Sequence, residues 1–288
     1  MKSPLRWTVL SLTLIAVLAG ATTLVVRGRN RLPAAPAPDG PVTSLVLDLG
    51  KGVGLELVRV NPGDFVMGSP ASETGHDPSE SPQRKVHVGR AIFMGKFEVT
   101  QGQYQAVMGL NQGTFKEDPR RAIDNISWTD GVKFCKYVSE RTGRTVRLPT
   151  EAEWEYACRA GSDTAFAFGD TLRAQDAVFN WSKVDAAAGK PDRPAVVDTT
   201  RPNAWGLYGM HGNVWEWCQD AFADGYAAHS GTQAAVPAAN PQSAEVDYVY
   251  RGGSWRSGPA ECRSAVRFAG SGELRSDVMG FRVVVEVR

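Results

Sequence analysis

Residues 147–157 read RLPTEAEWEYA and predict a helix with a well-marked start. Thr150 and Glu153 form the Thr-x-x-Glu pattern of a capping box, in which each side chain bonds the backbone N–H of the other residue. Trp154 and Tyr156 follow directly. The chain has eight Trp, and a buried indole N–H needs a partner, so we expect a core that contains polar networks as well as apolar contacts.

Two more helices are predicted upstream of this stretch. Residues 100–108 (TQGQYQAVM) fit a short helix. Ser127 is a candidate N-cap with Asp130 three residues later, and Gly143 is the expected left-handed residue that ends the helix between them.

Short apolar runs between turn residues predict the strands. Residues 55–60 and 65–67 flank the turn cluster Asn-Pro-Gly-Asp at 61–64, and we expect these two runs to pair as a hairpin. Further strand candidates are residues 86–88, 91–94 and 283–287. Expected loops are residues 69–83 and most of 161–250. The pattern is mixed α/β, rich in loops and without βαβ regularity.

The composition is that of an ordinary globular protein. The 288 residues are 42% apolar and 22% charged, which excludes disorder, collagen and coiled coil as the main state. Lys+Arg 32 against Asp+Glu 31 gives a net charge of +1. A general nucleic-acid binder needs a basic surface, so no nucleic-acid partner is expected.

The N-terminal segment has the features of an export signal. Lys2 and Arg6 precede an uncharged run over residues 7–26, and Ala19-Gly20-Ala21 fits a cleavage site. The run is also long enough, at about 20 residues, to remain as a membrane anchor. In both cases we expect export to the periplasm by the general secretory route.

The chain is therefore divided into three segments. Residues 1–26 are a signal peptide or signal anchor, and residues 27–43 are a Pro/Ala-rich linker. Residues 44–288 form the folded domain, which is long enough to bury one substantial core.

Several common catalytic signatures are absent from the sequence. The four His residues have no metal-binding spacing, and there is no HExxH, GxSxG, Walker or GxGxxG motif. The four Cys residues form no CxxC pair, which disfavours a zinc site and a thioredoxin-type motif.

The stretch 147–157 is one of several motifs that occur in the order of one family. The others are residues 202–208 (PNAWGLY), 212–217 (GNVWEW), 251–255 (RGGSW) and 280–282 (GFR). With them, residues 50–288 resemble the formylglycine-generating enzyme family, also called the sulfatase-modifying-factor domain. The resemblance implies a single loop-rich α/β domain related to C-type lectins.

The resemblance implies more than one activity. One branch of the family oxidises a sulfatase cysteine with a Cys pair that binds copper and O2. A second branch uses a three-His iron site, which this sequence lacks. A third is periplasmic and acts in maturation of the pyoverdine chromophore, and this chain is most similar to that branch.

The copper-binding Cys pair is incomplete here. By the family spacing, the first position is Ser257 and the second is Cys262. A hydroxyl cannot replace a soft thiolate copper ligand, so neither copper nor haem is expected.

A second alignment, anchored at residues 265–267, places Cys262 at the position of a family disulfide instead. That alignment implies a Cys158–Cys262 disulfide, with Cys135–Cys218 as the remaining pair. Four free, buried thiols are the alternative.

Glu261 is the candidate catalytic residue, because it lies in the loop that replaces the copper-binding loop. A carboxylate there acts as a general base if burial raises its pKa, and the alternative is a solvated loop acid. Three residues are expected to bind a carboxylate or catechol-type substrate: Trp255, Arg256 and Arg263. Arg267 and Arg282 either join them or are core residues.

The resemblance also implies structural Ca2+, which accepts six to eight mixed oxygen ligands. One ligand set carried over from the family is Gly209, Gly212, Val214 and Glu216, in which Gly209 lacks the usual side-chain oxygen. The other is Asn180, the Trp181 carbonyl and one downstream acid, either Asp185 or Asp192.

The leading hypothesis is an exported protein that oxidises the dihydro-chromophore of a pyoverdine siderophore precursor, a small molecule or peptide. Glu261 would take a proton while O2 or an unidentified acceptor takes the electrons. The alternatives are a non-catalytic binding or assembly module on the same fold and an atypical formylglycine-generating enzyme. An oxidase predicts a deep pocket lined by Trp255, Glu261 and Arg residues, whereas a binding module predicts an open groove and a solvated Glu261.

Overall fold

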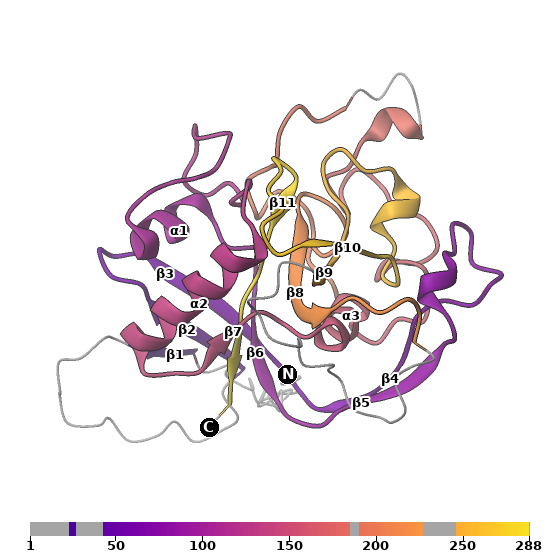
Figure 1. Cartoon of the computed structure of the whole chain (residues 1–288), viewed down its shortest axis with the longest axis horizontal. Helices are drawn as coiled ribbons and strands as arrows, with labels where there is room; N and C mark the ends of the chain where they lie inside the picture. Colours follow the sequence, from indigo (N-terminus) through magenta and orange to yellow (C-terminus); the bar gives the residue numbers. More distant parts are fainter. Residues whose placement is uncertain (1–22, 27–42, 185–189, 227–245, 288) are drawn as a thin grey trace, which may run out of the picture.

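The computed structural model describes residues 23–26, 43–184, 190–226 and 246–287. Two sheets lie next to each other, and a two-stranded hairpin extends from the side of the smaller one (Figure 1). Most of the expected leader, the linker residues 27–42 and Asp185 lie outside the described residues. Among the residues that are described, no helix is both long and apolar enough to cross a membrane.

The larger sheet has six strands in the order β1-β2-β3-β6-β12-β7. Their bounds are Thr23–Val26, Ser44–Asp48, Gly54–Val60, Ile92–Gly95, Val284–Glu286 and Val146–Arg147, in that order. In β2, the buried Leu45 and Leu47 alternate with partly exposed residues, as expected for a strand with one face on the core. The parallel strand β1 pairs Thr23 with Ser44, so the structure places the end of the apolar leader run in the sheet.

Three α-helices lie among the described residues, and each begins with a capping box. α1 spans Gln101–Met108, α2 spans Trp128–Thr142 and α3 spans Glu151–Arg159. The caps of α2 and α3 are Ser127 with Asp130 and Thr150 with Glu153, and Gly143 ends α2 in the left-handed conformation at φ 67°. All three predicted helices are therefore confirmed.

The smaller sheet has the order β10-β9-β8-β11. Its strands span Arg267–Ser271, Asp247–Arg251, Trp215–Ala221 and Met279–Gly280. α2 packs on β7 and β8, whereas α3 packs on β8, β9 and the two-stranded hairpin. β8 lies inside a region that we expected to be mostly loop, and it carries the GNVWEW motif into the core. Its residues from Trp215 to Cys218 are all buried, and the polar Glu216 is as buried as its Trp neighbours, so this part of the strand has no solvent face.

The expected hairpin between residues 55–60 and 65–67 is wrong in its pairing. Both runs are strands, but β3 pairs with β2 and β6 in the larger sheet. β4 (Gly63–Met67) instead pairs with β5 (Arg84–Val88), which follows the loop 69–83. The Asn-Pro-Gly-Asp turn therefore moves the chain from one sheet to a separate hairpin. Within the loop, Pro78–Glu80 form the short 3₁₀ helix η1.

A buried set of ion pairs, which we call the core network, connects α3 to the smaller sheet, and its member Arg282 also donates to the Gly95 carbonyl of β6 in the larger sheet. Its members are Arg251, Arg267 and Arg282 with Glu151, Glu155 and Glu216. Arg267 Nε and Nη2 donate to the two Glu151 oxygens at 2.7 and 2.8 Å. Burial alone would raise the pKa of Glu151, but the Arg267 and Arg251 guanidinium groups outweigh it and lower that pKa. Arg267 and Arg282 are thus core residues, which was the structural alternative for both.

Candidate functional site

The loop that follows β9 returns to the core through the 3₁₀ helix η4 (Pro259–Cys262). Gly252 and Gly253 begin the loop with φ values of 100° and 80°. A Cβ at Gly253 would lie 2.5 Å from the Cys262 sulfur and 3.0 Å from the Glu261 carbonyl oxygen. Glycine at 253 is therefore required by both its backbone conformation and the close approach of η4.

Ser254 and Ser257 stabilise this loop from within. Both are buried, and their hydroxyl oxygens lie 3.2 Å apart. The Ser257 hydroxyl accepts from the Ser254 N–H at 3.1 Å, and the Ser257 N–H donates to the Ser254 carbonyl at 3.0 Å. At the expected first thiolate position, the chain thus has a hydroxyl that is used to hold the loop together.

His211 connects the loop to α3. Its Nδ1 lies 2.8 Å from the Cys262 carbonyl, and because a carbonyl only accepts, Nδ1 carries the proton. Nε2 then accepts from the Ala167 N–H at 3.1 Å and lies 3.6 Å from the Cys158 sulfur. Burial lowers the pKa of His211 from 6.5 to about 4, which agrees with a neutral ring in a structural role.

The predicted Cys158–Cys262 disulfide is not formed, because all four cysteines are free and buried. The Cys158 sulfur contacts His211, and the Cys262 sulfur lies against Gly253 instead. Burial raises the pKa of Cys158 to about 12 and raises that of Cys262 still further, so neither is a thiolate at neutral pH. This donor set does not fit the copper-binding pair.

Glu261 lies in η4 at the surface, and it caps the start of its own helix. Its Oε2 accepts from the Gly258 N–H at 2.7 Å and lies 3.5 Å from Lys183 Nζ. The side chain is 44% exposed. This is not the buried environment that the general-base hypothesis required.

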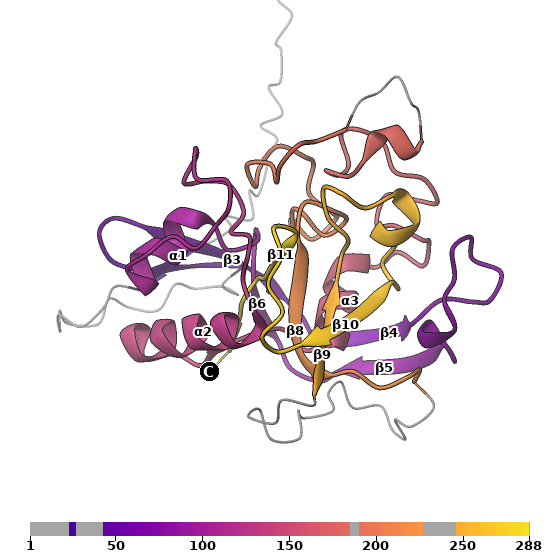
Figure 2. The same ribbon diagram turned by 45° about the horizontal axis from the view of Figure 1, so that its top comes forward.

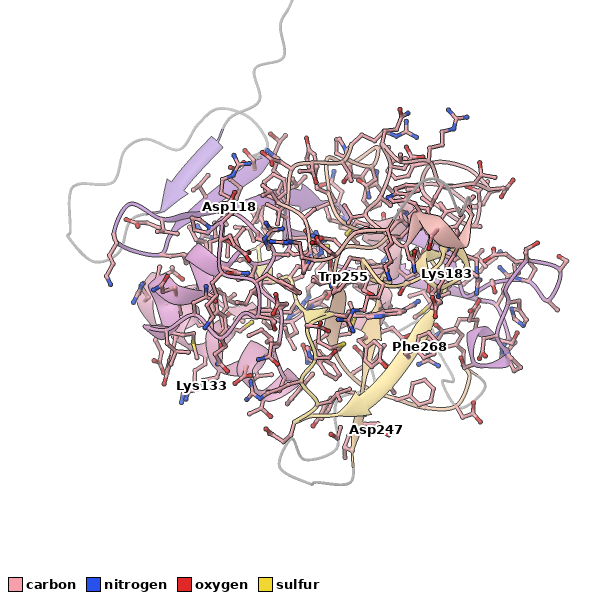
Figure 3. The ribbon with its side chains drawn as sticks, turned by 90° about the horizontal axis from the view of Figure 1, so that it is seen from above. Asp118, Lys133, Lys183, Asp247, Trp255 and Phe268 are labelled. Atoms are coloured by element: carbon pink, nitrogen blue, oxygen red, sulfur yellow. The ribbon has the colours of Figure 1, made fainter. Side chains whose placement is uncertain are left out.

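Trp255 and Arg256 form a separate contact beside the loop. The Trp255 indole donates to the Asp277 carbonyl at 3.1 Å, while the Arg256 guanidinium lies 4.4 Å from the indole centroid and pairs with the Asp277 carboxylate. In Figure 3, Trp255 lies near the middle of the molecule and Lys183 lies to its right. Trp255 and Glu261 therefore bond different parts of the chain, Asp277 and Gly258.

Arg263, directly after η4, forms ion pairs with Glu73 and Glu80 of the segment 69–83. We call these three residues the clasp. Nη1 donates to Glu73 Oε1 at 2.5 Å and to Glu80 Oε2 at 2.9 Å. Nη2 donates to Glu80 Oε1 at 2.7 Å and to the Gly75 carbonyl, and Nε donates to the Ala260 carbonyl at 3.0 Å. A guanidinium has five N–H donors, so Arg263 has none left for a substrate carboxylate.

Ser69 and His76 complete the surroundings of Glu80. The Ser69 hydroxyl donates to Glu80 Oε2 and lies 2.7 Å from His76 Nδ1. The hydroxyl has one proton, which it uses in the hydrogen bond to Glu80. In the contact with Ser69, His76 must therefore be the donor. Ser69 is therefore not an activated nucleophile, because its proton does not go to the imidazole.

A pocket of about 510 Å³ opens beside the clasp. Figure 2 shows η4 and the loop 69–83, whose residues form two of its walls, on the same side of the molecule. The pocket is lined by Ser72, Glu73, Thr74, Ala165, Phe166, Asp170, Pro259, Ala260 and Arg263. Of the predicted catalytic and substrate-binding residues, Arg263 alone is in this lining. Glu261 follows the lining residue Ala260 in the chain.

The first calcium set does not fit a divalent cation. Arg282 donates to both Glu216 oxygens at 2.6 Å, and the Trp154 indole donates to Oε2 at 2.7 Å. Gly212 and Val214 can offer only backbone carbonyls, and a side chain at Gly209 would overlap the Glu98 carboxylate. Burial raises the pKa of Glu98 to about 7, and no described residue bonds its Oε2.

The second calcium set is partly used by local hydrogen bonds. Asn180 Oδ1 accepts from the Ser182 hydroxyl at 2.6 Å, and the Trp181 carbonyl accepts from the Val184 N–H at 2.9 Å. Asp192 pairs with Arg193, and Asp185 is not among the described residues. A calcium ion on this set stays a prediction.

Residues 53–287 match the family described as the sulfatase-modifying factor enzyme 1-like domain. This chain belongs to that family. The formylglycine-generating enzyme of Streptomyces coelicolor is 34% identical over 174 residues, which are 57% of this chain and 52% of that protein. The enzyme of Bos taurus is 30% identical over 178 residues, 58% of this chain and 45% of that protein. The chain thus spans about half the length of the curated relatives it matches.

Solved structures agree with the sulfatase-modifying-factor assignment. PvdO from Pseudomonas aeruginosa superposes with a TM-score of 0.74 and 27% identity, covering 84% of this chain and 98% of that chain. Treponema denticola variable protein 1 gives 0.70 at 23% identity, covering 86% and 100%. The predicted loop-rich α/β fold of the sulfatase-modifying-factor family is confirmed.

The sequence did not predict the acidic partners of Arg263 in the clasp or the pocket residues contributed by the loop after α3. Glu80 is fully buried, yet it lies in a polar, Pro-rich stretch that reads as a surface loop. Phe166 and Asp170 come from a region without periodicity. The buried Arg263 requires a counter-ion, but the sequence contains many acids and does not indicate which one supplies it.

Proposed function

We propose that this protein is exported to the periplasm and takes part in oxidative maturation of a pyoverdine-type siderophore precursor, which binds in the pocket beside η4. The observation that carries the proposal is the similarity to PvdO over 98% of that chain. The absence of a thiolate pair in the loop 257–262 supports the same branch rather than the copper enzymes.

The reaction would remove two electrons and two protons from the dihydro-chromophore. Reduction of O2 to H2O2 balances this loss. Among the described residues, two carboxylates, those of Asp170 and Glu73, line the pocket, and Glu261 adjoins the lining residue Ala260. Glu73 is bonded to Arg263, so Asp170 and Glu261 are the candidate proton acceptors. Because Glu261 is half exposed, it would pass a proton to solvent rather than act as a buried base.

A non-catalytic binding module is the second candidate. The observation that favours it is the state of the polar groups around the loop: Ser257 bonds within the loop, Glu261 caps η4, and Arg263 is saturated by the clasp. Such groups shape a pocket but are not free to react.

Gene deletion in the native host tests the proposal. We expect loss of the siderophore's chromophore absorbance and fluorescence, and accumulation of a precursor that carries two additional hydrogen atoms by mass. Wild type and Asp198→Asn, which alters an exposed acid that does not line the pocket, should restore the product at normal protein level.

The same complementation experiment tests which of the two carboxylates, Asp170 or Glu261, takes part in the reaction. Failure of Asp170→Asn or Glu261→Gln to restore the product would assign that carboxylate to the chemistry. An unchanged siderophore profile after deletion would reject oxidative maturation and leave the binding module.

A further inference from the structure

We propose that the pocket beside η4 selects a ligand with an aromatic or apolar body and a cationic amine or guanidinium group, and that it disfavours carboxylates. The inference rests on the proposed function only in taking this pocket as the place where the precursor binds. It replaces the expectation that arginines of this region bind an acidic substrate.

The first argument is the state of the only cation among the described lining residues, Arg263. Its side chain is 2% exposed, and all five N–H donors are engaged by the clasp and two carbonyls. A carboxylate ligand would have to displace Glu73 or Glu80 from the guanidinium. Displacing Glu80 would leave that buried carboxylate without its partner, which is costly.

The second argument is the net charge of the pocket lining. The lining has two acids, Glu73 and Asp170, and one cation, so its formal charge is −2 + 1 = −1. Glu80, buried behind Arg263, adds a further negative charge. Outside the lining, the exposed Lys183 is paired with Glu261, which is on the same short helix as Pro259 and Ala260.

Asp170 is the acid that a ligand would meet. It is exposed, and it forms no hydrogen bond or ion pair with any other described residue. Its carboxylate therefore keeps its full capacity to accept from an ammonium or guanidinium group. Glu73, by contrast, already uses Oε1 for Arg263.

The rest of the lining favours an apolar body. Phe166, Ala165, Pro259 and Ala260 supply carbon surface, while Ser72 and Thr74 add hydroxyl groups of the loop 69–83. A volume of about 510 Å³ lies in the range of small-molecule sites, which combine mostly apolar walls with a few polar groups.

Three probes that share one phenol ring test the charge preference. They are tyramine, tyrosol and 3-(4-hydroxyphenyl)propionate, which end in an ammonium, a hydroxyl and a carboxylate. Binding to the exported protein is measured by calorimetry and by NMR shifts at low salt, because an exposed ion pair is screened. We expect tyramine to bind tightest and the carboxylate weakest.

Asp170→Asn should weaken tyramine about two- to fivefold, the effect of one exposed ion pair, and leave tyrosol unchanged. Asp198→Asn, an exposed acid outside this pocket, should change neither. Equal or tighter binding of the carboxylate probe, or an unaltered tyramine affinity in Asp170→Asn, would overturn the inference. A normal siderophore profile after gene deletion with the tyramine preference intact would reject the proposed function alone.

Discussion

The core network and the clasp are built from the same Arg–Glu pairs, but they hold different parts of the molecule. The core network joins α3 to the smaller sheet and bonds β6 of the larger one, and Arg251, Arg282 and Glu216 are fully buried within it. The clasp joins a surface loop to η4, and Glu73 remains partly exposed. Loss of the first should therefore destabilise the whole domain, whereas loss of the second should open one pocket.

The largest effect is expected for Arg282→Met in the core network. Removing the guanidinium leaves Glu216 buried with only the Trp154 indole as a partner, and such a change costs about 3–5 kcal/mol. Denaturant unfolding should show a lower midpoint with an unchanged slope. Arg193→Met, which breaks exposed pairs with Asp192 and Glu117, is the matched control and should lie within about 1 kcal/mol of wild type.

His211 lies between the two regions, and its protonation makes the stability of the domain depend on pH. Its folded-state pKa is about 4, below the unfolded value of 6.5, so the unfolded chain binds more protons in that interval. Its contribution to stability is complete above pH 6.5 and is lost as the pH falls towards 4, by about 3 kcal/mol. In His211→Gln the unfolding free energy should have a shallower slope over this interval; an identical slope would show that other groups control it.

Arg263→Lys should have a smaller and more local effect. A lysine keeps the charge but cannot reproduce the fork that bonds Glu73, Glu80 and two carbonyls, so we expect a loss of about 1–3 kcal/mol. Hydrogen exchange should accelerate in residues 69–83 and in η4 but not in α2. Uniform acceleration across the chain would mean that the clasp belongs to the global core.

The sequence predicted the helices because their signals are local. A capping box and a left-handed glycine specify the start of α2 and its end at Gly143 whatever the rest of the chain does. Strand pairing is not local: β3 pairs with β6 across the whole β4–β5 hairpin, although the Asn-Pro-Gly-Asp turn suggested pairing with β4. β8 was missed because it is buried on both faces.

The site was predicted less well than the fold, for a related reason. The motifs indicated a loop in which Arg263 lines a pocket, but the use of its donors depends on Glu73 and Glu80, which are 190 and 183 residues away. Glu261 was selected by its position in a family loop, and position alone does not give burial. Whether a polar side chain is free to act depends on contacts that come from other parts of the chain.

The smallest effect on stability is expected for Glu261→Gln, which separates the chemistry of the pocket from its structure. Its carboxylate is exposed to 44%, and an amide oxygen can still accept from the Gly258 N–H, so the unfolding free energy should change by less than about 1 kcal/mol. The clasp should be unaffected, since Arg263 bonds the Ala260 carbonyl and not this side chain. If the variant protein is stable and binds tyramine normally but fails to restore the siderophore chromophore, Glu261 acts in proton transfer. If it restores the chromophore fully, the carboxylate only caps η4, and Asp170 becomes the candidate for that role, because the other lining acid, Glu73, is bonded to Arg263.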